Sequence, residues 1–104
     1  PNPAPQQEQP ERRITPLAFR HRFTSAEKTA LELAALDDPA APQEQRQRAA
    51  LIRAYLADLH AAQFVCLDCE HIQEAVRNLR AMGLLTQERA DAILTAPIQP
   101  GETL

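Results

Sequence analysis

The sequence predicts an all-α protein, and the positions of its prolines carry most of that prediction. The 104 residues contain nine prolines and only two glycines. No proline occurs between residues 17 and 38 or between residues 43 and 96, and both stretches are rich in Ala, Leu, Glu, Gln and Arg. Because proline breaks a helix interior, long helices can form only in these stretches. The length allows one small domain, and we expect four helices in it.

The composition also limits the function. Two glycines are too few for a glycine-rich phosphate loop, and two cysteines are too few for a disulfide framework. The net charge of −3 is opposite to the basic surface of most nucleic-acid binders. No apolar run approaches the ~20 residues of a membrane span, and the first residues lack the basic and apolar regions of a secretory signal. We expect a cytosolic chain that is not an enzyme and takes no cofactor, small-molecule substrate or nucleic acid.

The first segment, residues 1–13, has no large apolar side chain and is expected to be an extended arm. Its composition cannot bury enough surface to fold alone, so the alternative is a disordered tail. A proline-rich strand loses little conformational entropy on docking, because it is already extended. Apolar anchors follow in residues 14–23, which fit either a strand-like lead-in or a loop over the helices. The residues expected to bind a partner protein are Pro1, Pro3, Pro5, Pro10, Ile14, Leu17, Phe19 and Phe23.

The helical domain is expected to span residues 14–98. Its first long helix starts at Thr24, because residues 24–27 read Thr-Ser-Ala-Glu, the pattern of a capping box. The Asp-Asp-Pro sequence at 37–39 ends this helix. The second helix runs from about residue 43 to residues 60–62, with an apolar face at helical spacing.

A short β-prone run at residues 64–67 separates the two halves of the domain as an extended linker or one edge pair. The third helix, from residue 68 or 69 to 82, ends at Gly83, which suits a left-handed C-terminal cap. Thr86 caps the fourth helix, which Pro97 ends. The last two helices therefore form an αα-hairpin, and residues 99–104 are a C-terminal tail.

The sharpest local motif is Cys66-Leu67-Asp68-Cys69, a C-x-x-C pair. With His71 nearby and His60 upstream, four zinc ligands could be counted, but the spacing is not that of a zinc finger. No thioredoxin-like pattern surrounds the pair, and a structural disulfide is not expected in a reducing compartment. We expect two small, partly buried thiols, with the zinc site as the alternative.

The last two helices also resemble a DNA-binding helix-turn-helix in outline. The segment that would be the recognition helix, residues 87–93, carries one arginine against two acids. Phosphate neutralisation requires a cationic surface, so a packed helical hairpin is the better interpretation.

Three ordered segments carry a family resemblance. Residues 14–28 read ITPLAFRHRFTSAEK, residues 55–65 run from YLADL to AAQFV, and residues 79–97 read LRAMGLLTQERADAILTAP. In this order they resemble a group of small proteins encoded among the tail and tail-fibre genes of tailed bacteriophages and prophages. The resemblance covers roughly residues 14–98, so the arm lies outside it. Those relatives have ordinary polar residues at the positions of Cys66 and Cys69, and they supply no catalytic residues.

The resemblance implies a structural protein of the virion, made in the bacterial cytoplasm and placed in the tail, at the baseplate or where fibres attach. Its partners would be other tail proteins and copies of itself around a symmetry axis. One alternative is an assembly chaperone for tail or tail-fibre proteins that is absent from the finished particle. Another is a small zinc or DNA-binding regulator.

Overall fold

A computed structural model of the chain describes residues 12–103. Pro1, Pro3, Pro5 and Pro10, which the sequence predicts to bind a partner, lie outside the described residues, as does most of the predicted arm.

The described chain is mostly helical, which confirms the predicted class. Two short strands and a final 3-10 helix accompany the α-helices. In chain order the elements are β2 (Arg13–Ile14), α1 (Pro16–His21), α2 (Ser25–Ala35), α3 (Gln43–Ala61), β3 (Val65–Cys66), α4 (Glu70–Ala81), α5 (Gln87–Thr95) and η1 (Pro100–Thr103). The predicted count of four α-helices is wrong, because residues 12–103 contain five.

The additional helix is α1, a six-residue helix where the sequence indicated a strand-like or looped segment. Its start follows helix-capping rules. The Thr15 side chain accepts a hydrogen bond from the Ala18 backbone N–H at 3.0 Å, and Pro16 occupies the first turn, where no backbone donor is needed. The segment was missed because one and a half turns are too short to show a helical period.

Three of the predicted helix caps are confirmed. Thr24 and Glu27 form the capping box of α2, and the Thr86 side chain caps α5. After α4, Gly83 has a φ of +83°, which glycine adopts without the Cβ clash of other residues. The Leu84 N–H donates to the Leu79 carbonyl at 3.0 Å, which completes a Schellman motif.

Strands β2 and β3 form a two-stranded antiparallel sheet, so residues 64–67 provide an edge pair. Arg13 lies opposite Cys66 and Ile14 opposite Val65. The Leu67 N–H extends the ladder with a 2.8 Å bond to the Arg12 carbonyl. The sheet therefore joins the start of the described chain to its middle.

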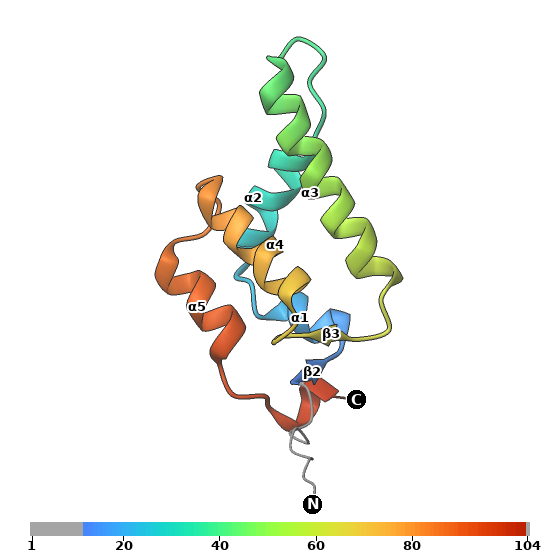
Figure 1. The fold of residues 1–104 in the computed structure, drawn as a ribbon, viewed down its shortest axis with the longest axis vertical. Helices are drawn as coiled ribbons and strands as arrows, with labels where there is room; N and C mark the ends of the chain where they lie inside the picture. Colours follow the sequence, from blue (N-terminus) through green and yellow to red (C-terminus); the bar gives the residue numbers. More distant parts are fainter. Residues whose placement is uncertain (1–11, 104) are drawn as a thin grey trace, which may run out of the picture.

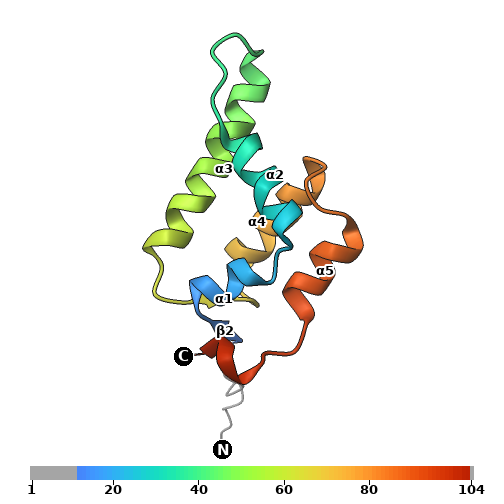
Figure 2. The same cartoon turned by 180° about the vertical axis from the view of Figure 1, so that it is seen from behind.

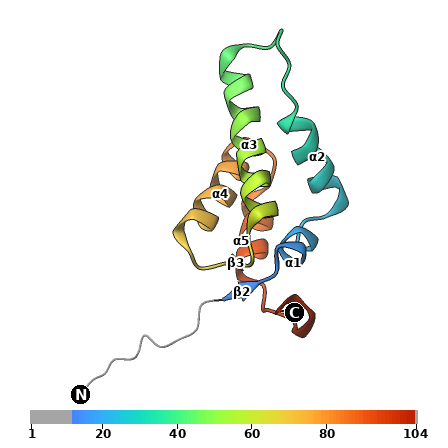
Figure 3. The same ribbon diagram turned by 90° about the vertical axis from the view of Figure 1, so that its right-hand side faces the viewer.

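The helices form two antiparallel hairpins. Helices α2 and α3 make a long hairpin whose loop projects from one end of the molecule (Figure 1). Helices α4 and α5 form the second, and α1 lies with the sheet at the end opposite the projecting loop, which is also clear from behind (Figure 2). The side view places α2 and α4 on opposite sides of α3 (Figure 3). The most buried large side chains of the core are Ile14, Leu67, Ile93, Val65 and Val76.

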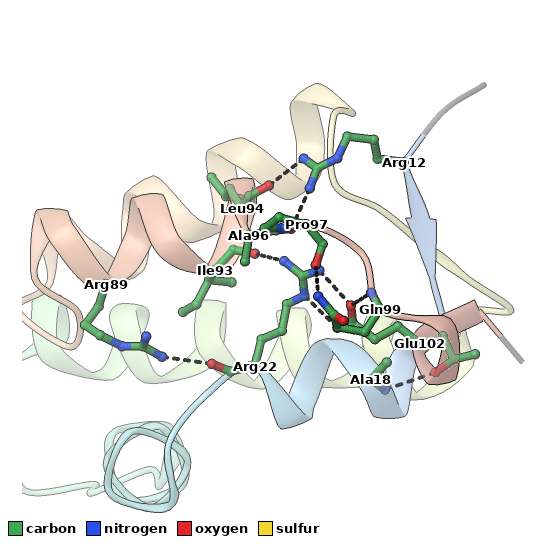
Figure 4. A network of polar contacts seen from close by, with 11 residues as sticks. Arg12, Ala18, Arg22, Arg89, Ile93, Leu94, Ala96, Pro97, Gln99 and Glu102 are labelled. Carbon is green, nitrogen blue, oxygen red and sulfur yellow. Dashed lines mark hydrogen bonds and ion pairs between the residues drawn. The ribbon is translucent and has the colours of Figure 1, made fainter. Parts of the chain in front are cut away.

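The last described residues pack against α1 and β2. The Thr15 N–H donates to the Glu102 carbonyl at 2.8 Å, and the Arg22 guanidinium pairs with the Glu102 carboxylate. Figure 4 shows this polar network, in which Arg12 also donates to the carbonyls of Leu94 and Ala96, each at 2.8 Å. Residues that the sequence sets apart as a C-terminal tail are thus held on the helical body. Within residues 12–103 no helix is both long and apolar enough to cross a membrane.

Candidate functional site

An apolar cleft of about 220 Å³ lies between α2, α3 and α4. Apolar side chains from all three helices form its walls, and the ring of Phe19 and the side chain of Val65 come from α1 and β3. The principal apolar wall residues are Leu31, Ile52, Leu56, Leu59, Ile72 and Leu79. Helix α3 packs along α2, while α4 pairs with α5, so the cleft opens where the two hairpins meet.

One polar contact crosses between the two hairpins beside the cleft. The Asn78 Nδ2 atom of α4 donates a 2.7 Å hydrogen bond to the Tyr55 hydroxyl of α3. Tyr55 lines the cleft, whereas Asn78 lines a separate shallow depression with Leu51 and Met82. The Tyr55–Asn78 bond therefore links α3 to α4 between the two hollows.

The cleft lining combines an apolar interior with several charged residues. The charged residues are Arg20, Lys28, Glu32 and Asp58, and His71 also lies in the lining. Phe64, also in the lining, is 44% exposed, and the Arg13 guanidinium lies 4.2 Å from the centre of its ring. An exposed aromatic ring beside charged groups is typical of protein-binding surfaces.

The lining is mostly apolar, and Tyr55 contributes a hydroxyl group to it. The volume exceeds the ~150 Å³ of a cavity that accommodates benzene, so a bulky apolar side chain fits by size. The volume and the apolar lining therefore suit an apolar side chain.

The structure distributes the predicted partner-binding residues differently from the sequence analysis. Ile14 is 2% exposed, Phe19 8% and Phe23 7%, so these side chains pack in the core of the chain itself. The rings of Phe19 and Phe23 meet edge to face, with centroids 5.4 Å apart. Phe19 and Phe23 also contribute to the lining of the cleft. Leu17 is 61% exposed and lies on the outer surface, outside the cleft lining.

Cys66 and Cys69 form a disulfide, and the expectation of two free thiols is wrong. Their Cα atoms are 5.4 Å apart, within the bridging range, because a tight turn connects β3 to α4. A reducing compartment disfavours disulfides in general, but this turn places the two cysteines within bonding distance. The sulfurs of the disulfide are not available as thiolate ligands. His60 and His71 are exposed, and residues 12–103 contain no cluster of three His, Cys, Asp or Glu side chains suited to a metal.

The arginine that a DNA-binding interpretation would need is engaged within the protein. Arg89 of α5 donates to both Glu27 carboxylate oxygens, at 2.7 and 3.0 Å, and to the Arg22 carbonyl at 2.8 Å. The hydrogen bond from Arg89 holds the pKa of Glu27 below its usual value. This pairing uses Arg89 to join α5 to α2 and leaves Glu88 and Asp91 exposed on the same helix.

The sequence analysis did not identify the cleft. Its lining comes from positions between 19 and 79, which only the tertiary fold brings together. One signal was available: Phe64 is an aromatic residue in a short segment between two helices, a position with few neighbours to cover it.

The fold defines a small, mostly helical protein with an apolar cleft between its two hairpins. No protein-family model, curated protein or solved structure matches this chain.

Proposed function

We propose that this chain is a protein-binding component of a bacteriophage tail that has no enzymatic activity and uses the cleft to hold another tail protein. The cleft is the observation that carries the binding role. Its apolar lining, exposed Phe64 and charged residues match the apolar core and polar rim of protein interfaces. The resemblance of residues 14–98 to small tail-associated proteins supports the placement in a tail.

Further exposed apolar residues support association with other proteins. Leu33 and Leu36 lie at the end of α2 and are 65% and 67% exposed. The end of α2 faces the projecting loop of the α2–α3 hairpin, away from the sheet (Figure 1). Together with Leu17 they give the chain exposed apolar side chains outside the cleft.

Mass spectrometry of purified phage particles tests the proposed location of this protein in the tail. Particles produced by the genome that encodes this chain should contain it in constant proportion to the major tail proteins. Absence from particles, combined with failure of tail assembly when the gene is deleted, would instead identify an assembly chaperone. Absence from particles with normal assembly would refute both roles.

A filling mutation tests the cleft. Ala75 of α4 lines it, so Ala75→Phe should occupy part of its volume and prevent incorporation into particles. Ala57→Phe is the matched control, because Ala57 is exposed on α3 and does not line the cleft. Both purified variants should retain helical circular dichroism. Equal incorporation of folded Ala75→Phe and Ala57→Phe protein would show that the cleft is not the binding site.

A further inference from the structure

We propose that the Cys66–Cys69 disulfide is a reversible redox pair that exchanges with low-molecular-weight thiols, with Cys69 as the sulfur that is attacked. This inference goes beyond the proposed function and does not depend on it. It rests on the turn that the disulfide closes, the different environments of the two sulfurs, and the charges around the start of α4.

The disulfide adds little constraint to a turn that is already closed. Only two residues separate the cysteines, and the Cys69 N–H donates to the Cys66 carbonyl at 3.2 Å. The stabilisation from a cross-link grows with the length of the loop that it closes, and this loop is very short. The chain can therefore lose the bond without losing its fold, which a redox pair requires.

Other contacts hold the same turn when the disulfide is open. The Leu67 N–H bonds to the Arg12 carbonyl at 2.8 Å, and the Gln73 side chain donates to the Leu67 carbonyl at 3.3 Å. Leu67 itself is fully buried. These contacts fix the segment between the two cysteines to β2 and α4.

The two cysteines differ in access and in electrostatic environment. Cys66 lies in β3 and is 3% exposed, whereas Cys69 is partly exposed. Cys69 is also the N-cap residue of the 12-residue helix α4, and its side chain makes no capping hydrogen bond. The positive end of the helix dipole stabilises a thiolate at this position, and opening the disulfide gives the sulfur a capping role.

Two carboxylates flank Cys69, and each has an arginine partner. Asp68 lies 3.7 Å from an Arg12 guanidinium nitrogen, and Glu70 lies 2.7 Å from one of Arg77. This pairing reduces the repulsion that the carboxylates exert on a thiolate or on an approaching anionic thiol. The start of α4 thus remains suited to a negatively charged sulfur.

The exchange proceeds in two displacements. A thiolate such as that of glutathione attacks Sγ of Cys69, forming a mixed disulfide while the bond to Cys66 breaks and Cys66 leaves as a thiolate that takes up a proton. A second thiolate attacks the glutathione sulfur and releases Cys69. The protein disulfide gains two electrons and two protons overall, and two thiols become one disulfide.

Thiol trapping after equilibration tests reversibility. The whole chain is equilibrated without denaturant with reduced and oxidised glutathione at varied ratios, quenched with acid, alkylated in urea so that the buried Cys66 also reacts, and analysed by mass spectrometry. We expect the doubly alkylated form to appear and disappear reversibly with the ratio, while far-ultraviolet circular dichroism stays unchanged. A disulfide that is reduced only when urea is present during the equilibration, or loss of helix on reduction, would overturn the proposal.

Mapping the mixed disulfide tests the direction of attack. Brief treatment of the intact disulfide with reduced glutathione should place glutathione on Cys69, and glutathione on Cys66 would refute Cys69 as the attacked sulfur. Single-cysteine variants test the stabilised thiolate at Cys69: Cys66→Ser keeps only Cys69, and Cys69→Ser keeps only Cys66, so each is the matched control for the other. Folded Cys66→Ser protein should react with oxidised glutathione at least about tenfold faster than folded Cys69→Ser protein, and equal rates, or faster reaction of Cys66, would refute the stabilised thiolate.

Discussion

Arg22 and Glu102 form a two-point ion pair between positions 80 residues apart. The Nε and one terminal nitrogen of Arg22 each lie 2.9 Å from a different carboxylate oxygen of Glu102. The remaining terminal nitrogen donates to the Ile93 carbonyl at 2.8 Å. One guanidinium thus joins the residue after α1 to α5 and η1, and this three-way contact closes the fold (Figure 4).

Removing the charge of Glu102 should destabilise the protein. The Arg22 side chain is only 7% exposed, so a neutral partner leaves a largely buried cation less well compensated. We expect Glu102→Gln to lower the free energy of unfolding by about 1–2 kcal/mol, measured by urea denaturation. Glu70→Gln is the control, because its pair with Arg77 is exposed and is expected to contribute less than about 0.5 kcal/mol. Equal losses would contradict the role assigned to burial.

Low pH should weaken the ion pair between Arg22 and Glu102. The hydrogen bond from Arg22 holds the pKa of Glu102 below its ordinary value of 4.5, and Arg89 does the same for Glu27. A carboxyl with a lowered pKa in the folded state stabilises the protein above its unfolded pKa, and this stabilisation is lost as the pH falls through the folded pKa. The stability difference between the native chain and Glu102→Gln should be constant from pH 7 to about pH 5 and shrink below about pH 4.5. Urea denaturation at each pH measures it, and a difference that grows in acid would contradict the assignment.

The two glycines should respond differently to alanine. Gly83 has a φ of +83°, where an L side chain is strained, although a Cβ there would meet no atom within 4 Å. Gly83→Ala should therefore cost about 1–2 kcal/mol through backbone strain alone. Gly101 has equally open surroundings and no positive φ, so Gly101→Ala should be neutral or slightly stabilising. Thermal unfolding compares them, and similar midpoints for the two variants would contradict the left-handed cap.

The Tyr55–Asn78 bond should couple α3 to α4. Tyr55→Phe removes the acceptor hydroxyl and leaves the Asn78 amide without this partner, at an expected cost of about 1 kcal/mol. A double-mutant cycle with Asn78→Ala isolates the pair from other effects of each substitution. We expect a coupling energy of about 0.5–1.5 kcal/mol from urea denaturation. Additive single-mutant effects would show that the bond does not form in solution.

The sequence was informative wherever local chemistry determines the backbone. The capping box at Thr24 and Glu27, the Thr86 cap and the turn at Gly83 depend on residues within one helical turn, and all three were predicted. Helix α1 was missed because a six-residue helix carries too little pattern. The disulfide was not predicted, because the reducing environment of the cytosol disfavours disulfides and the sequence does not show the distance between Cys66 and Cys69.

Local sequence patterns do not predict the cleft or the contacts of Arg22 with Glu102 and Ile93. Arg22, Glu102 and Ile93 are not neighbours in the sequence, and no local pattern distinguishes a buried arginine from a solvated one. The cleft depends on the separation between two hairpins, which the packing of α3 on α2 and of α4 on α5 sets. The sequence by itself determined the helical class and most helix ends, because these follow from backbone preferences over a few residues. The tertiary structure alone decided which apolar side chains are buried and which surround an open site, because that depends on contacts between distant parts of the chain.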